Sequence, residues 1–384
     1  MASRARACAW IVGVAAVTVC GARGIDAHKA VTSPYDYNKD VFPLLRTHCG
    51  SCHVEGGAAP MSLMTYKDAV PWAESIRDEL TEGRMPPWPV SAKSRAVEGG
   101  HPISAHDLDT IVTWASGGTP HDWSGHPKQA LPAVAAKTGW RLGPPSLMLA
   151  MDTPHRLAAD TLEETCDFSL SSGTTEAKWI KAVDLLAGTP SMVRDAIISV
   201  DNGPVLALWE PGGDGIAAPG GTAFRLAAGA KIHLHIHYKK HYDQGQNAMA
   251  DKSIVGLYFA DTPAPQAIDS IVVNSTAVGD ASATQTFSAT LATDGRIVAL
   301  SPMLDRAYGS IDVAAVPPGG KRISLLKLDG PRSRWFYRYW LQDPLEVAKG
   351  TTIEVTAVPL ADYSDELKSG PSFPLHVNID YVAQ

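Results

Sequence analysis

The chain has 384 residues, which is too long for one ordinary domain and enough for two or three that each bury a core. Hydrophobic residues make up 45% of it and charged residues 19%, as in a globular protein. The 33 basic and 40 acidic side chains give a net charge of -7, which argues against nucleic acid as a partner.

The first thirty residues are typical of a secretory signal peptide. Arg4 and Arg6 precede the apolar stretch "CAWIVGVAAVTVC", and small residues follow it. This stretch is shorter than a retained membrane anchor requires, and Val19 is a poor residue before a lipid-modified Cys20. We therefore predict that residues 1–30 are removed and that the mature chain is periplasmic or secreted, with no membrane span.

Three helices are expected in the next part of the chain. Apolar residues recur at helical spacing in residues 40–48, in residues 62–80, and in a stretch that begins at the capping signal of Ser104 and Asp107. Gly117 ends this third helix. We expect residues 31–125 to form a small all-α domain.

The pattern changes after a linker rich in Pro, Ala and Gly at residues 126–145. Short β-rich runs follow, separated by turn residues; examples are "KIHLHIHY", "SIVGLYF", "GRIVALS" and "TTIEVTAV". Such runs are typical of antiparallel β-sandwiches, and the remaining length suits two of them. We expect a multidomain fold in which the all-α domain precedes two jelly-roll-like sandwiches, at 146–262 and 263–384.

Cys49, Cys52 and His53 form a Cys-x-x-Cys-His motif, the attachment sequence of c-type haem. Each thiol can add to one vinyl group of the porphyrin, and the adjacent imidazole can reach the iron. A zinc site lacks a second Cys or His pair nearby, and a thioredoxin-like disulfide would follow a strand. We predict haem c attached to both cysteines, with His53 as an axial ligand of the iron.

Met85 is the expected second axial ligand. It follows a helix, lies 85 − 53 = 32 residues beyond His53, and precedes two prolines that stiffen its loop. Met61 and Met64 are alternatives, but they leave less chain to reach the far face of the ring. A core methionine is the other interpretation of Met85. His/Met ligation fills both axial positions, so it predicts electron transfer and not catalysis at iron.

Four motifs carry a resemblance in this part of the chain: "DVFPLLRTHCGSCH", "APMSLMTYKDAVPWAESI", "RMPPW" and "DLDTIVTWASGGTP". In this order they resemble the cytochrome c domain at the front of a group of bacterial exported proteins. The resemblance covers the whole expected helical domain.

The rest of the chain resembles a second family, in "GWRLGPP", "LWEPGGDGIAAPGGTAFRLAAGAKIHLHIHY", "VALSPMLDRAYGSIDVAAVPPGG" and "DPLEVAKGTTIEVTAV". These motifs are similar to the copper type II, ascorbate-dependent monooxygenases, the family of peptidylglycine hydroxylating monooxygenase and dopamine β-monooxygenase. The resemblance spans most of residues 139–358. It implies two stacked sandwiches that each carry one copper in the enzymes, with a substrate cleft between them.

The copper ligands implied by this resemblance are mostly replaced. Arg194 and Asp195 stand where the family has a His-His pair, and only His237 matches a ligand of the first copper. Met303 and Asp305 stand where the second copper has a His-x-His. Copper needs several converging neutral imidazoles, and a guanidinium repels the ion. We therefore expect the sandwich module to have lost the copper chemistry.

A replacement metal site is conceivable at His233, His235 and His237, which alternate along one strand and therefore share a face. Neighbours in such a row can share one copper ion. The alternative is a solvent-facing or hydrogen-bonded row of histidines. Cys166 is expected to be a buried thiol and not a reactive one.

These observations predict an exported monohaem cytochrome c that exchanges electrons with a redox partner protein or a small-molecule donor or acceptor. The sandwich module is expected to act in binding or docking. The alternative is a copper-dependent monooxygenase, an oxidoreductase that uses its cytochrome as a built-in electron donor. A third possibility is a surface-assembly protein with a purely structural haem.

Overall fold

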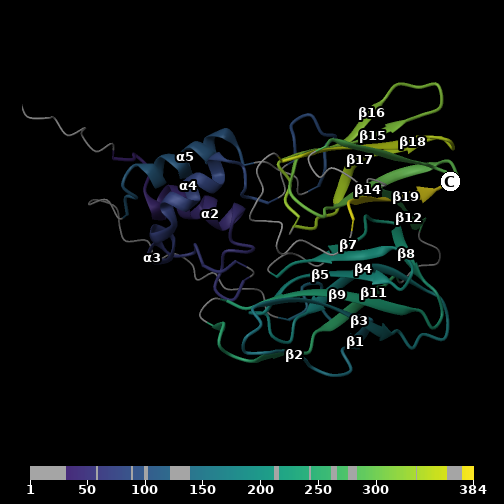
Figure 1. The fold of residues 1–384 in the computed structure, drawn as a ribbon, viewed down its shortest axis with the longest axis horizontal. Coiled ribbons are helices and arrows are strands. Elements are labelled where there is room, and N and C mark those ends of the chain that lie inside the picture. The colour runs from purple at the N-terminus through teal and green to yellow at the C-terminus, as the bar shows by residue number, and fades with distance from the viewer. Residues whose placement is uncertain are drawn as a thin grey trace, which may run out of the picture.

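The structure is a computed structural model, in which the helices gather at one end and the strands at the other (Figure 1). It describes residues 32–57, 59–87, 90–98, 103–121, 139–211, 216–241, 244–260, 266–275, 283–333, 335–360 and 374–384. The predicted signal peptide and residues 126–138 of the predicted linker lie outside these ranges. Within them, every helix is too short or too polar to cross a membrane.

The helical part has a core of its own, in which Tyr37, Leu45, Ile111 and Trp114 are fully buried. Its elements are the π-helical turn η1 (Tyr37–Val41), α2 (Phe42–His48), α3 (Tyr66–Ala69), the 3-10 turn η2 (Val70–Trp72), α4 (Ala73–Thr81) and α5 (Ala105–Ser116). The packing therefore brings the first and last of these elements together around shared apolar side chains.

Two of the three expected helices have different boundaries from those predicted. The first begins three residues early, because the Asp36 carboxylate accepts hydrogen bonds from two N–H groups of its first turn. The second begins after the capping residue Thr65 and tightens at Pro71, whose missing N–H interrupts the helical ladder. The cap at Ser104 is confirmed, since its Oγ accepts from Asp107 N at 3.0 Å.

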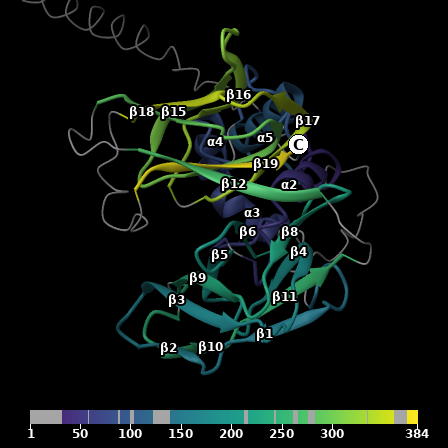
Figure 2. The same ribbon diagram turned by 90° about the vertical axis from the view of Figure 1, so that its right-hand side faces the viewer.

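The rest of the described chain is mostly β-sheet, arranged as two β-sandwiches one above the other (Figure 2). The first contains β1 (Leu147–Ala150), β2 (His155–Leu157), β3 (Glu163–Ser171), β4 (Lys178–Leu186), β5 (Val193–Val200), β6 (Val205–Trp209), β7 (Ile216–Ala217), β8 (Thr222–Leu226), β9 (Lys231–Lys239), β10 (Met249–Asp251) and β11 (Ile254–Phe259). The second contains β12 (Gln266–Asn274), β13 (Gln285–Thr290), β14 (Gly295–Met303), β15 (Tyr308–Val316), β16 (Ile323–Asp329), β17 (Tyr339–Val347), β18 (Thr352–Pro359) and β19 (His376–Ala383).

The four runs quoted as strands fall in β9, β11, β14 and β18, so their prediction is confirmed. The alternation within β9 is regular: Ile232, Leu234, Ile236 and Tyr238 are fully buried in the core of the first sandwich. The histidines between them therefore lie on the opposite face of the sheet.

The two sandwiches share one sheet, which the expectation of separate antiparallel sandwiches missed. Its strand order is β1-β11-β4-β8-β12-β19-β14-β17, and the junction is a short parallel pairing of β8 with β12. The opposing sheets are β3-β9-β5-β6 in the first sandwich and β13-β18-β15-β16 in the second. Trp340 and Val382 of the second sandwich consequently pack in the core of the first.

A buried arginine ties the sandwiches together at this junction. Arg338 forms an ion pair with Asp380, Nε to Oδ2 at 3.0 Å, and these side chains are only 3% and 1% exposed. Its guanidinium donates hydrogen bonds to the carbonyls of Leu206 at 2.7 Å and Val205, both in the first sandwich. It also lies over the ring of Trp340. The cation thus connects the two sandwiches through residues that are 132 and 133 positions apart in sequence.

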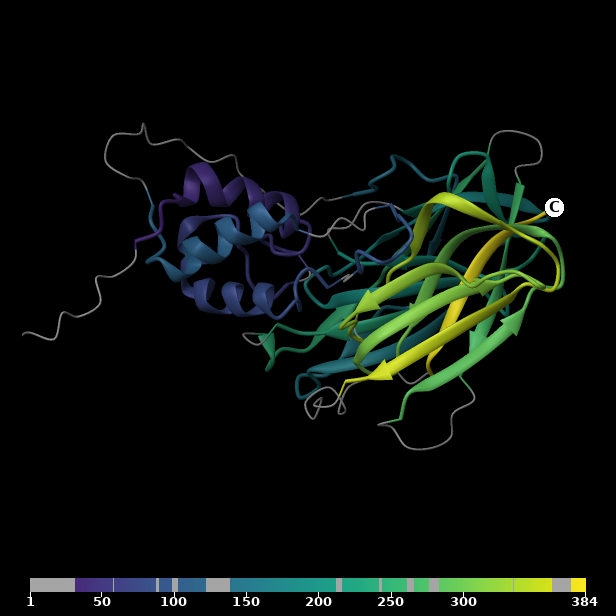
Figure 3. The same ribbon diagram turned by 90° about the horizontal axis from the view of Figure 1, so that it is seen from above.

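The segment 90–98, between α4 and α5, attaches the helices to the second sandwich (Figure 3). It forms isolated β-bridges to two edge strands, from Val90 to Leu328 and from Val97 to Leu341. Val97 is 4% exposed and belongs to the core of the second sandwich. This pairing fixes the position of the helical part relative to the strands.

Val97→Asp is expected to detach the helical part, because it would bury a charge among apolar side chains and remove an anchor worth about 1.5–3 kcal/mol. Small-angle scattering should then give a larger radius of gyration than for the native chain. Lys93→Asp is the matched control, since Lys93 is exposed in the same segment. An unchanged radius for Val97→Asp would contradict this description.

Residues 139–145, which the sequence assigned to the linker, instead pack on the first sandwich. The Tyr258 hydroxyl donates to Gly143 O at 2.7 Å, and Arg141 N donates to Asp184 Oδ2 at 2.9 Å. Trp140 lies against Gly256, where an added Cβ would be 2.6 Å from the indole ring. Only glycine fits at that position, so the contact is specific.

Candidate functional site

The Cys-x-x-Cys-His motif lies on the turn that ends α2. Cys49 N donates to Leu45 O at 2.8 Å, which completes the helix, and His53 N donates to Cys49 O at 2.8 Å. Cys52 N is 3.2 Å from the same Cys49 carbonyl. Both cysteines are free thiols. One compact turn therefore presents two thiols and an imidazole together.

Both thiols of the motif are held in their neutral form. Burial, followed by the neighbouring Cys52, raises the pKa of Cys49 to about 12. Burial and then the Glu210 carboxyl raise the pKa of Cys52 to about 11, while a hydrogen bond from Ser51 opposes them. A disulfide oxidoreductase needs a thiol of lowered pKa, so this pair does not suit that chemistry.

The His53 ring has the protonation state that a metal ligand requires. Its Nδ1 lies 3.3 Å from the carbonyl oxygen of Met61. A carbonyl only accepts, so Nδ1 carries the proton and Nε2 is left with a free lone pair. Burial lowers the pKa of His53, although this hydrogen bond opposes the shift. The three residues of the motif therefore fit a covalently attached haem.

The three candidate methionines lie in different surroundings. Met64 is buried in the helical core, with its sulfur 3.2 Å from the position of a Cβ added to Gly50. Met61 offers its carbonyl to the His53 ring. Met85 lies four residues after the end of α4, is half-buried, and is not part of the described helical core. Of the three methionines, Met61 and Met64 pack in or against the described helical core, and Met85 does not.

A buried carboxyl of the first sandwich lies near the motif. The Oε1 atom of Glu210, just after β6, is buried. Burial and then the charge of Asp195 raise the pKa of Glu210 to about 8. Burial is the largest cause of the raised pKa of Cys52, and the Glu210 carboxyl is the second largest. For Tyr339, burial and then Tyr337 raise the pKa most, and Glu210 is the third cause. The charge of Glu210 therefore influences both the Cys-x-x-Cys-His motif and Tyr339 of the second sandwich.

The histidine row lies on one face of β9 as predicted, and carboxylates bind it. Asp167, directly opposite His235 on β3, has its Oδ1 2.7 Å from His235 Nδ1 and 3.2 Å from His233 Nε2. This contact matches the hydrogen-bonded alternative for the row.

His237 contacts a carboxylate through each of its ring nitrogens. Nδ1 lies 2.8 Å from Asp195 Oδ2, and Nε2 lies 2.8 Å from Glu163 Oε1. The other oxygen of Glu163, Oε2, pairs with Lys239. Burial disfavours the charged ring, but the hydrogen bonds to both carboxylates outweigh it and raise the pKa of His237 to about 9. An imidazolium has no lone pair for copper.

His237 should make stability depend on pH. Its pKa in the folded chain is raised from 6.5 to about 9, so its contribution is fully present below pH 6.5 and is lost as pH rises through 9. The contribution is at most about 3 kcal/mol. The difference in unfolding free energy between the native chain and His237→Gln should therefore shrink from pH 6 to pH 10.

Chemical denaturation across this range measures the effect. His376→Gln is the control, because burial lowers the pKa of that ring, although the hydrogen bond from its Nδ1 to the Pro374 carbonyl raises the pKa. A His237→Gln difference that stays constant with pH would show that the ring is not charged in the folded chain.

The positions implied for a second copper ligand pair have structural roles. Met303 is 2% exposed and packs with Ile197, Leu208 and Phe336, so it joins the two sandwiches through apolar contact. Asp305 accepts a hydrogen bond from Tyr308 and pairs with Arg306. The described contacts thus explain these residues without a metal.

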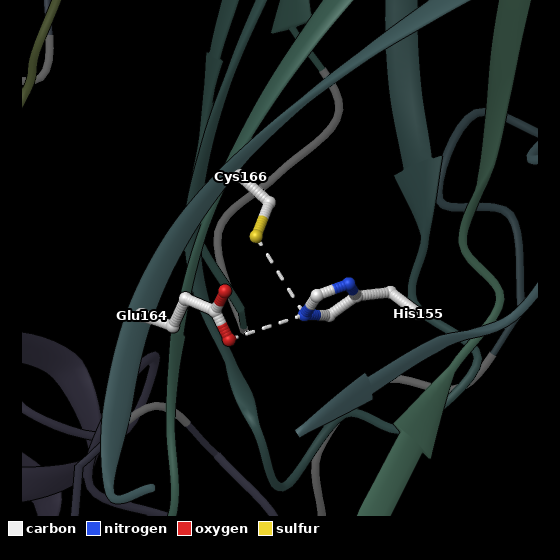
Figure 4. Close-up of side chains that lie close together, drawn as sticks. All are labelled: His155, Glu164 and Cys166. Carbon is white, nitrogen blue, oxygen red and sulfur yellow. Dashed lines mark hydrogen bonds and ion pairs between the residues drawn. The ribbon is translucent and has the colours of Figure 1, made fainter. Parts of the chain in front are cut away.

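One cluster of metal-binding side chains in the described residues was not predicted. His155 Nε2 lies 3.6 Å from Cys166 Sγ and 3.5 Å from Glu164 Oε2 (Figure 4). Cys166 is half-buried and not fully buried as expected. The two-residue spacing of Glu164 and Cys166 on a strand was the only sequence pattern that pointed to this cluster. It was not sufficient, because His155 belongs to a different strand pair.

No known family matches this chain, and no curated protein matches it. Among solved structures, the major capsid protein P2 from bacteriophage PM2 is 10% identical, over 62% of this chain and 96% of that chain, with a TM-score of 0.26. Allantoicase from Saccharomyces cerevisiae is 8% identical, over 57% of this chain and 77% of that chain, with a TM-score of 0.20. These similarities are too low to support an inference about fold or function.

Proposed function

We propose that the protein is an exported c-type cytochrome that transfers electrons through one covalently bound haem. The observation that carries this proposal is the His53 ring, which is neutral, half-buried and fixed by Met61 O with Nε2 free, beside two free thiols on the same turn. A haem bound there would supply reversible one-electron chemistry at its iron.

The residues of the chain have separate tasks in this proposal. Cys49 and Cys52 would hold the porphyrin by thioether bonds, and the His53 imidazole would bind its iron. Met61 O keeps the proton on Nδ1 and so keeps Nε2 available. Met85 would fill the other axial position. Two protein ligands would exclude oxygen and peroxide from the iron, which favours electron transfer to a redox partner protein or a small molecule.

We propose that the sandwich module acts in binding or docking. Both ring nitrogens of His237 contact carboxylates, and Met303 is packed between the sandwiches. The alternative, a copper-dependent monooxygenase, would have to break these contacts to free its ligands. Copper analysis of the purified protein separates the two functions, because the proposed cytochrome contains one iron and no stoichiometric copper.

Met85→Ala is expected to lower the reduction potential, because a His/Met pair raises the potential relative to His paired with a harder ligand such as water. Spectroelectrochemical titration measures this shift. Met61→Leu, which keeps the backbone carbonyl that fixes His53, should leave the potential near the native value. A large shift with Met61→Leu and none with Met85→Ala would overturn the assignment of the second axial ligand.

A further inference from the structure

The edge of the first sandwich brings together three donors of different chemistry. Glu164 and Cys166 alternate along β3, the edge strand of the sheet β3-β9-β5-β6, and so point to the same side. His155 comes from β2, which pairs only with β10 among the described strands. In Figure 4 the thiol and the carboxylate both point toward the His155 ring.

The His155 ring is held in place by its neighbours. It stacks on Tyr238, with ring centroids 4.8 Å apart, and meets the edge of Phe168 at 5.8 Å. Tyr238 is fully buried, and its hydroxyl donates to Asp251 Oδ2 at 3.1 Å. Asp251 is in turn the residue opposite His155 in the β2–β10 pair. This support positions the imidazole before any ligand arrives.

We propose that His155, Glu164 and Cys166 bind one Zn²⁺ ion, with the fourth position open to water or an added ligand. Imidazole nitrogen, carboxylate oxygen and thiolate sulfur are all ordinary zinc ligands, and three protein ligands with one open position are usual outside structural sites. One thiolate and one carboxylate also balance the charge of the ion.

The separations of the donors match tetrahedral zinc. Bonds of about 2.0–2.3 Å at a tetrahedral angle place neighbouring donors roughly 3.3–3.7 Å apart. The distances from His155 Nε2 are 3.5 Å to Glu164 Oε2 and 3.6 Å to Cys166 Sγ. All three donor atoms lie within 4.8 Å of one another. Only a small closure between the carboxylate and the thiol is then needed to surround an ion.

The site is accessible and separate from the histidine row. The side chains of His155 and Glu164 are 17% and 42% exposed, so an ion can enter from solvent. Glu164 and Cys166 of β3 lie opposite Tyr238 and Ile236 of β9. The histidines of the row lie opposite the residues that alternate with Glu164 and Cys166, so they are on the other face of the sheet. The site is therefore also distinct from the positions that the copper enzymes would use.

Zinc binding at this site must displace a proton. Burial has the largest effect, followed by the hydrogen bond that the thiol donates to Glu164 and by the charges of Glu164 and Asp167; together they raise the pKa of Cys166 to about 12. The thiol is thus neutral without metal. When the ion binds, the S–H bond breaks, the Zn–S bond forms, and one proton passes to solvent, with no change of oxidation state.

The test uses the mature haem-containing protein, titrated with Zn²⁺ by calorimetry in two buffers of different ionisation enthalpy. We expect one zinc per chain and release of about one proton per zinc. Zinc should also protect Cys166 from alkylation, which mass spectrometry of the modified peptide detects. This second measurement needs only the native chain, so it decides the question even if a variant fails to fold.

Three variants, Cys166→Ser, His155→Gln and Glu164→Gln, should each weaken zinc binding. Each should weaken it by more than the roughly 10- to 100-fold loss seen when a residue that only hydrogen-bonds to a metal ligand is replaced. His233→Gln on the opposite face is the matched control and should bind zinc normally. The proposal would be overturned if the native chain did not bind one zinc, if zinc did not protect Cys166, or if the three variants bound zinc as tightly as the native chain. Haem content, read from visible absorption, is independent of these outcomes, so the proposed cytochrome function is tested separately.

Discussion

The Cys49→Ala/Cys52→Ala double variant is expected to lose all covalently bound haem, whereas each single variant keeps haem through its remaining thioether bond. The two thiols lie on one turn and are both free, so each can form its own bond to the porphyrin. Acid–acetone extraction of protein made in a host competent for cytochrome maturation measures this difference. Haem should stay with the native chain and leave the double variant.

Cys166→Ala is the control for that experiment, because Cys166 lies on β3, outside the helical part. It should retain haem as the native chain does. Haem that resists extraction from the double variant, or that is fully extracted from the native chain, would contradict covalent attachment at this motif.

Arg338→Met is expected to lower the free energy of unfolding by about 3–5 kcal/mol, because it leaves the Asp380 carboxylate buried without its cation. It also removes hydrogen bonds to two carbonyls of the first sandwich. A fall of roughly 10 °C in Tm should accompany this loss. Urea unfolding and calorimetry measure both quantities.

Two further variants show whether the buried charge causes the effect. Arg322→Met removes an exposed partner of Asp312 and should change stability by less than about 1 kcal/mol. Combining Arg338→Met with Asp380→Leu should restore part of the loss, because no unpaired charge then remains. An Arg338→Met variant as stable as Arg322→Met would contradict the proposed role of Arg338 at the junction.

Features confined to one element could be predicted from the sequence. Ser104 caps α5 as its spacing with Asp107 predicted, since donor and acceptor are three residues apart. The alternation of His233, His235 and His237 with buried residues follows from the two-residue period of a strand. Such patterns depend on local geometry, which the order of residues determines directly.

Features made by distant residues could not be predicted in this way. The parallel pairing of β8 with β12 depends on how two sandwiches meet, and the docking of Val97 depends on an edge strand more than 200 residues later. The resemblance implied that Asp195 stands at the position of a copper ligand. It did not reveal that this carboxylate would bind His237, because register across strands decides that contact.

The approach of His155 to Cys166 has the same origin. The two residues are 11 apart in sequence, but they belong to different strand pairs, and their contact depends on the packing of β2 against β3. A motif search has no fixed spacing to recognise there. By contrast, the Cys-x-x-Cys-His motif is contiguous, which is why its three residues were predicted together.

The central claim is tested most directly by the intact mass and the visible spectrum of the mature native protein, made in a host that attaches haem. The account predicts a mass equal to the polypeptide plus one haem, one iron per chain, and a reduced spectrum of a six-coordinate c-type cytochrome. A colourless protein with the mass of the bare polypeptide would contradict it.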